Sequence, residues 1–174
     1  MTGWKYIVWF LLLYPLVIIQ ASFLPHLSVR GVTPDLIFIV IFLWIFLFPK
    51  EKKFIYILSI AGGLLLENYS ILPFFGLSVV ALLLIILLVK KLGSVMQGFS
   101  IFSLLIIFSA AFLCFKFIPA VSAFIITLAQ KRVIFLPLTF SWKYLAISWG
   151  TDLIIVVGYF YFYELFYKKK SQRN

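Results

Sequence analysis

Charged, thiol and imidazole groups are scarce in this 174-residue chain. Only 11% of its residues are charged, five are acidic, and it has one cysteine and one histidine. A soluble domain carries about a quarter charged residues, so this composition excludes an ordinary soluble globular protein. The single cysteine excludes an intrachain disulfide, and without CxxC or HExxH motifs no metal centre is expected.

Apolar residues, in contrast, make up 65% of the chain and gather in runs such as LIFIVIFLWIFLF and VVALLLIILLV. Runs of roughly 17 to 25 apolar residues cross a bilayer as helices. These runs also lack the alternation of polar and apolar residues that membrane strands require. The sequence therefore predicts an all-α polytopic membrane protein, with residues 1–174 forming a single transmembrane domain in the lipid bilayer.

About six transmembrane helices are expected, at residues 6–23, 34–48, 54–70, 73–89, 99–115 and 142–167. Residues 116–141 contain apolar stretches that are too short to span, so they are predicted to form an external interfacial or re-entrant segment. In the alternative arrangement, the fifth helix continues past Pro119 with a bend.

The net charge of +10 comes from basic residues at the ends of the expected helices. No soluble face carries them, so membrane topology explains them better than nucleic-acid binding does. Of the 15 Lys and Arg residues, ten lie on the side of the two termini and five, including Lys116, on the other. The positive-inside rule then predicts a multi-pass protein with both termini in the cytoplasm.

A polar stretch, QASFLPHLSVRGVTPDL, separates the first two expected helices. Thr33 can cap the second helix, Pro34 suits its first turn, and Asp35 faces the positive end of its dipole. His26 could pair with Asp35, although a lone loop histidine is usually solvated.

Four of the five acids, Asp35, Glu67, Asp152 and Glu164, lie in or beside apolar spans, where a charge costs about 2.5 to 3.5 kcal/mol at a helix centre. Asp152 is the deepest: it could form an interhelical contact or a proton-accessible site, or start a later helix at Gly150. Glu67 follows Ser59 and Gly63 at intervals of four, on one stripe that permits close approach by a neighbouring helix. Packing inside the protein is favoured for this stripe, and solvation at the external interface is the alternative for Glu67.

The polar stretch at residues 20–36 resembles the amino-terminal signature of the MreD family of rod shape-determining proteins. In that family, Gln and Ser near the end of helix one precede Leu-Pro, a short loop with Gly, and Pro-Asp-Leu. AGGLLLENYSILPFFGLS is similar to the family's Gly-rich third helix, which ends in an acid before a loop with Pro and Gly. Glu67 stands where Asp is more usual, and the resemblance covers about residues 17–92.

The resemblance implies a non-catalytic component of the cell-elongation machinery in the bacterial cytoplasmic (inner) membrane, which maintains cell shape without a cofactor. Its implied partners are the membrane-anchored scaffold MreC and, through it, the actin-like MreB, the glycosyltransferase RodA and a class B penicillin-binding protein. The implied six-helix fold is shared with the substrate-binding subunits of energy-coupling-factor vitamin transporters. The candidate partner-binding or structural residues are Gln20, Ser22, Pro25, Pro34, Asp35, Gly63, Glu67 and Asp152.

Two other functions stay open at this point. A solute-binding subunit of an energy-coupling-factor transporter would share the fold, but the spans offer few convergent polar groups for a vitamin. The expected first helix, YIVWFLLLYPLVII, also lacks the small-xxx-small pattern with which such subunits meet their energising partner. An intramembrane enzyme or ion pathway would use Asp152 and Glu67.

Overall fold

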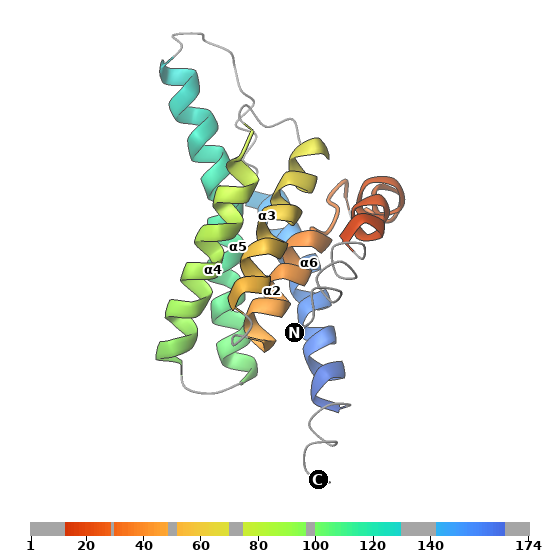
Figure 1. Ribbon diagram of the computed structural model, residues 1–174. Helices are drawn as coiled ribbons and strands as arrows, with labels where there is room; N and C mark the ends of the chain where they lie inside the picture. The colour runs from red at the N-terminus through yellow and green to blue at the C-terminus, as the bar shows by residue number, and fades with distance from the viewer. Residues whose placement is uncertain are drawn as a thin grey trace.

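The computed structural model describes residues 13–28, 30–48, 52–69, 75–96, 100–129 and 142–165, which are helical apart from short turns (Figure 1). None of these residues forms a strand, in agreement with the predicted all-α class. Three helices are long and apolar enough to cross a membrane: α4 (Leu77–Val95), the Ile101–Ser122 part of α5 (Ile101–Ala129), and α6 (Trp142–Tyr163).

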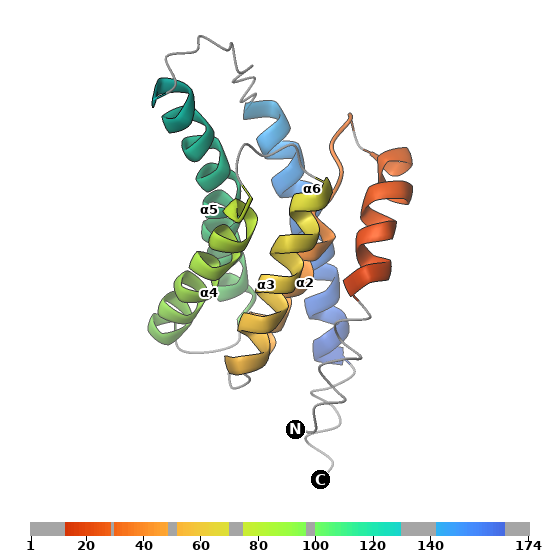
Figure 2. The same ribbon diagram turned by 45° about the horizontal axis from the view of Figure 1, so that its top comes forward.

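The other helices are α3 (Lys52–Tyr69), the short α2 (Leu36–Leu47) and a first helical stretch, Leu13–His26. This first stretch contains a π turn, η1 (Ile19–Phe23), and runs into a 3-10 turn, η2 (Leu24–Leu27). It stands at the edge of the bundle (Figures 1 and 2) and faces the bundle with buried Leu13 and Val17. Residues 6–12 of the expected first helix lie outside the described residues.

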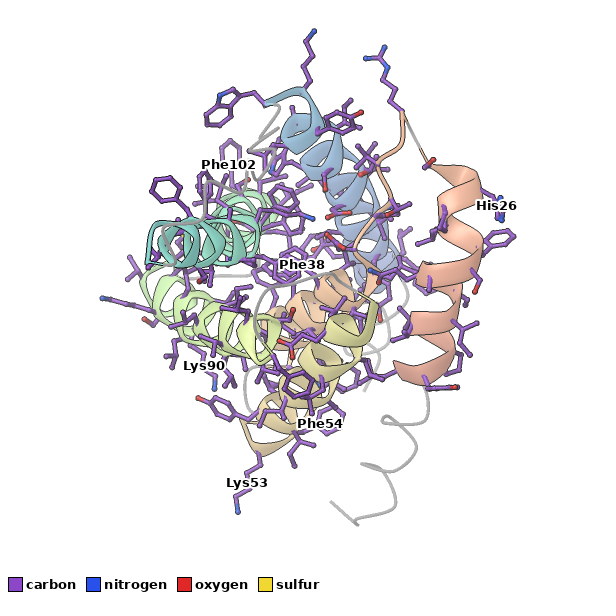
Figure 3. The ribbon with its side chains drawn as sticks, turned by 90° about the horizontal axis from the view of Figure 1, so that it is seen from above. His26, Phe38, Lys53, Phe54, Lys90 and Phe102 are labelled. Carbon is purple, nitrogen blue, oxygen red and sulfur yellow. The ribbon has the colours of Figure 1, made fainter. Side chains whose placement is uncertain are left out.

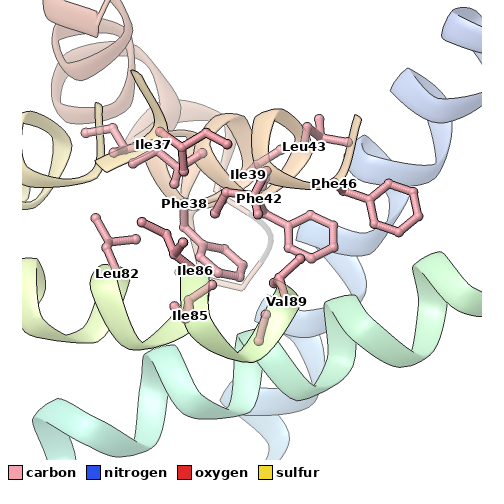
Figure 4. Packing of buried hydrophobic residues seen from close by; sticks show 14 of the residues in the cluster. Ile37, Phe38, Ile39, Phe42, Leu43, Phe46, Leu82, Ile85, Ile86 and Val89 are labelled. Carbon is pink, nitrogen blue, oxygen red and sulfur yellow. The ribbon is translucent and has the colours of Figure 1, made fainter. Parts of the chain in front are cut away.

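Helix α2 lies at the centre of the fold, in contact with α3, α4, α5 and α6. Its residues are apolar on every side, and most of them are buried, as expected for a helix enclosed by others. Phe38 stacks on Phe115 of α5 with ring centroids 4.8 Å apart, and Phe42 meets Phe108 edge to face at 5.1 Å. Leu82, Ile85, Ile86 and Val89 of α4 pack against the same side (Figure 4).

Helix α4 begins later and ends later than the sequence predicts. It starts at Leu77 because Gly76 has φ +104°, a left-handed conformation that glycine tolerates and an α-helix excludes. It continues through Lys90 and Lys91 to Val95, so the predicted end at residue 89 is wrong. Lysine is a good helix former, and a basic pair does not by itself end a helix.

Helix α5 corrects the prediction for residues 116–141. It runs as one helix from Ile101 to Ala129, with Pro119 inside it, so the predicted end at residue 115 is wrong. The alternative arrangement, in which the helix continues past Pro119, matches residues 116–129. Proline is tolerated inside apolar helices where neighbouring groups take up the freed backbone positions. Residues 130–141 lie outside the described residues.

Candidate functional site

Four polar side chains from distant parts of the chain meet at the start of α2. Gln20 comes from the first helical stretch, Asp35 precedes α2, Lys116 lies in α5 and Asp152 lies in α6. We call these four residues the polar cluster. Ionisable groups inside an apolar helix bundle mark functional sites by default, because they are costly unless they serve a purpose.

An ion pair between Asp35 and Lys116 forms the charged part of the cluster. The Lys116 ammonium donates to Oδ2 of Asp35, and the side chains are 30% and 17% exposed respectively. The ammonium also lies 5.6 Å and 5.7 Å from the ring centroids of Phe115 and Phe112, within the range of a cation–π attraction. The pair is therefore largely withdrawn from solvent and joins α2 to α5.

The remaining contacts of the cluster satisfy the first backbone amides of α2. The N–H of Asp35 donates to Oδ1 of Asp152 at 3.1 Å, and the N–H of Ile37 donates to Oε1 of Gln20 at 3.2 Å. The Gln20 amide donates in turn to Oδ1 of Asp35 at 3.4 Å. Helix amino termini leave amides unpaired, and here the acceptors come from other helices. The predicted cap at Thr33 is wrong, since Asp35 occupies the cap position and its own side chain makes no capping bond.

Asp152 is the most enclosed member of the cluster. Its side chain is fully buried, and its Oδ2 atom has no hydrogen-bond partner among the described residues. The helix around it begins at Trp142, so Asp152 lies in the helix interior and the alternative start at Gly150 is wrong. The interhelical contact predicted for Asp152 is present, since its Oδ1 atom accepts from the Asp35 amide.

Glu67 accepts hydrogen bonds from backbone amides at the start of α4, as Gln20 and Asp152 do at the start of α2. Its side chain is 9% exposed, and its carboxylate accepts from the N–H of Gly76 at 2.7 Å and of Ser78 at 2.8 Å. Solvation at an interface therefore does not account for Glu67. The carboxylate holds the end of α3 against the beginning of α4, and its negative charge faces the positive end of the α4 dipole.

We expect Glu67→Gln to lower the free energy of unfolding by about 1 to 3 kcal/mol, because the amide nitrogen cannot accept from one of the two backbone N–H groups. Equilibrium unfolding in mixed detergent micelles measures this loss. Amide hydrogen exchange at Gly76 and Ser78 should accelerate in the same variant. The exposed Lys143→Gln at the start of α6, away from the α3–α4 contact, is the control. Unchanged exchange at both amides in Glu67→Gln would contradict the capping role.

The predicted stripe on α3 is buried, as expected for packing inside the protein. Ser59 is fully buried, and a Cβ atom on Gly63 would lie 2.7 Å from the Val79 Cα atom of α4. Only a glycine permits this approach of the two helices, since backbone atoms cannot move aside as a side chain can.

Other predicted candidates lie outside the polar cluster. Ser22 and Pro25 are exposed, and Pro34 contributes a backbone carbonyl that accepts from Leu36 at 3.2 Å. His26 is exposed on the outer side of the first helical stretch (Figure 3), so the suggested pairing of Asp35 with His26 is replaced by the ion pair with Lys116. A cavity of about 250 Å³ lies nearby, lined by Val17, Gln20, Ala21, Pro25, Thr33, Ile37 and Leu66.

Lys116 is a site residue that is not among the candidates predicted from the sequence, because it follows the expected fifth helix and is predicted to lie in the external segment. One signal was available: a lysine inside an apolar run needs an acid, and the chain holds only five. Pairing the acids with basic residues inside the runs would have selected Lys116 as a partner of Asp35 or Asp152.

Chemically, the cluster is suited to holding helices together. It links the first helical stretch, α2, α5 and α6 through one ion pair and three further hydrogen bonds. Within the described ranges, no group of three or more His, Cys, Asp or Glu residues could hold a metal ion. Comparison of the chain with known protein families, curated proteins and solved structures finds no match.

Proposed function

We propose that the chain is a non-catalytic membrane assembly protein of the bacterial cell-elongation machinery, of the MreD type. The observation that supports this proposal is the set of hydrogen bonds formed by the residues that carry the resemblance. Gln20 and Asp35 bond to each other, and Glu67 bonds to Gly76 across the turn between α3 and α4. Polar side chains that form such hydrogen bonds fix the positions of the helices, and few of their atoms remain free to take part in catalysis.

In this proposal the chain has six transmembrane helices, and both termini lie in the cytoplasm. Its apolar outer surfaces associate with the membrane helix of an MreC-like scaffold, and through it with MreB, RodA and a class B penicillin-binding protein. Helices associate in lipid through close packing and few polar bonds. The polar cluster would fix the positions of the first helical stretch, α2, α5 and α6, so that these surfaces are presented to the partner as one rigid unit.

A solute-binding subunit of an energy-coupling-factor transporter is the second candidate. The cavity of about 250 Å³ beside Gln20 and Thr33 favours it, because both side chains can hydrogen-bond to a ligand. The cavity is smaller than the roughly 300 to 1,000 Å³ of typical ligand pockets. The assembly function therefore ranks first.

A pull-down of tagged protein from its native membrane in mild detergent, with copurifying chains identified by mass spectrometry, tests the proposal. We expect recovery of an MreC-like scaffold. Asp35→Lys should reduce this recovery strongly, because it places a second cation beside Lys116 and beside the positive end of α2. His26→Ala, which alters an exposed side chain of the first helical stretch, should leave recovery unchanged.

Recovery of a transmembrane coupling subunit together with ATPases would overturn the assembly function and favour the transporter subunit. Equal recovery of the scaffold with Asp35→Lys and His26→Ala would show that the polar cluster does not contribute to assembly.

A further inference from the structure

Helices α3 and α4 form an antiparallel pair with a well-defined line of contact. At one level Gly63 approaches Val79, and at another the Lys90 ammonium lies 3.4 Å from the Tyr56 hydroxyl and 4.5 Å from the centroid of its ring. We call this line the α3–α4 seam. It runs from the middle of the pair to the end where α3 begins.

On both helices, the residue directly after each seam residue in the sequence lies on the same outer face of the α3–α4 pair. In an antiparallel pair, one step along either helix rotates the side chain by about 100° toward the same face of the pair. All of the apolar residues on this side are exposed in the structure. They are Ile57, Ile60 and Leu64 of α3 and Val80, Leu84 and Leu87 of α4.

Among the described residues, basic side chains close this apolar surface at the end where α3 begins. Lys91 continues the line of exposed residues on α4, and Lys90 sits beside it against Tyr56. Lys53 is exposed and lies one helical turn before Tyr56 on α3, so the tyrosine is flanked by lysines from both helices. Figure 3 shows Lys53 and Lys90 on the same side of the α3–α4 pair.

The dimensions fit one leaflet of a membrane. From Val80 to Lys91 the helix rises about 16 Å at 1.5 Å per residue, close to half of the hydrocarbon core of about 30 Å. Helix α4 continues to Val95, so the lysines do not mark the end of the helix. They mark the depth at which its surface changes from apolar to basic, where lipid phosphates lie.

We propose that this face binds an anionic phospholipid. Lys90, Lys91 and Lys53 would hold its phosphate, with the Tyr56 hydroxyl as a further donor. The acyl chains would lie along the six exposed apolar residues. Charge complementarity identifies the occupant: among the described residues of this face, the lysines gather at one end and the other exposed side chains are apolar, so the face selects a lipid of negative net charge. This proposal does not depend on the function proposed above.

Native mass spectrometry of the detergent-solubilised chain, titrated with phosphatidylglycerol or with phosphatidylcholine, tests the proposal. We expect tighter binding of the first phosphatidylglycerol molecule than of the first phosphatidylcholine. Lys90→Gln and, separately, Lys53→Gln should each weaken phosphatidylglycerol binding about fivefold, which corresponds to about 1 kcal/mol per basic residue near the surface.

Lys143→Gln is the matched control, because it removes an exposed lysine at the start of α6, at the other end of the bundle (Figure 2). It should leave the affinity unchanged. Should Lys90→Gln not fold, Lys53→Gln and Lys91→Gln, both exposed, provide the same comparison. Equal affinity for the two lipids would overturn the proposal, as would an equal loss in Lys143→Gln or displacement of the lipid by millimolar inorganic phosphate.

Discussion

Lys116→Met is expected to lower the free energy of unfolding by about 2 to 4 kcal/mol, slightly less than the 3 to 5 kcal/mol typical of a fully buried pair. The substitution keeps the length and apolar stem of the side chain but leaves Asp35 without its cation. Asp35 is then a largely enclosed carboxylate whose own backbone amide bonds to a second carboxyl group, Asp152. Desolvation of this unpaired charge is the main source of the loss.

Asp35→Asn in the same chain should restore much of the stability. The double variant has no unpaired charge at this position, and an amide can still accept from Gln20. Equilibrium unfolding of the four chains in mixed micelles gives the coupling energy, which should exceed about 1 kcal/mol for residues in direct contact. Lys143→Met, an exposed position, should stay within about 0.5 kcal/mol of the parent chain. Additive effects of Lys116→Met and Asp35→Asn would show that the ion pair contributes nothing.

Gly63→Val is expected to lower the free energy of unfolding by about 3 kcal/mol, the upper end of the range for overpacking. Its Cβ atom would lie 2.7 Å from the Val79 Cα atom and 2.8 Å from the Val79 backbone nitrogen. Because these are backbone atoms, relief requires α3 and α4 to separate. Separation would also pull the Glu67 carboxylate away from the amides of Gly76 and Ser78.

Two other helical glycines provide a graded comparison in the same unfolding experiment. At Gly62 the added atom would meet the end of the flexible Ile41 side chain, 2.7 Å away, so Gly62→Val should cost less. At Gly93 nothing lies within 4 Å, and Gly93→Val should be nearly neutral, since valine has a slightly better helix propensity than glycine. Equal losses at Gly62 and Gly63 would contradict the close backbone approach at Gly63.

Local pattern was enough to predict much of this fold. The apolar runs predicted helices where α2, α3 and α6 lie, and the spacing of Ser59, Gly63 and Glu67 predicted a stripe that is in fact buried between helices. Helical periodicity depends on neighbours within a few residues, so a single sequence contains it. Asp35 and Asp152 are also predicted, because acids in apolar surroundings stand out, whereas Gln20 is predicted through the resemblance of residues 20–36 to the family signature.

The partners of these polar groups could not be predicted in the same way. Asp35 bonds to Lys116 and Asp152, which are 81 and 117 residues away, and no local pattern identifies a partner at that distance. The path of α5 is predicted only as the alternative arrangement: proline usually ends a helix in water, but an apolar helix can continue through Pro119. For Glu67 the sequence leaves interfacial solvation open as an alternative, because its acceptor role depends on backbone amides 9 to 11 residues later.

The wide sequence separation within the polar cluster also bears on biosynthesis. Ribosomes add roughly 5 to 20 residues per second, so for a chain inserted as it is made, Lys116 follows Asp35 by roughly 4 to 16 s and Asp152 by roughly 6 to 23 s. During this interval the start of the nascent α2 holds the Asp35 carboxylate without its cation and the Asp35 amide without its acceptor, because Lys116 and Asp152 have not yet been made. Ribosome stalling or truncation after α4 would leave this defect in place. Such a product would display to membrane quality-control proteases a charged helix end that the finished protein conceals.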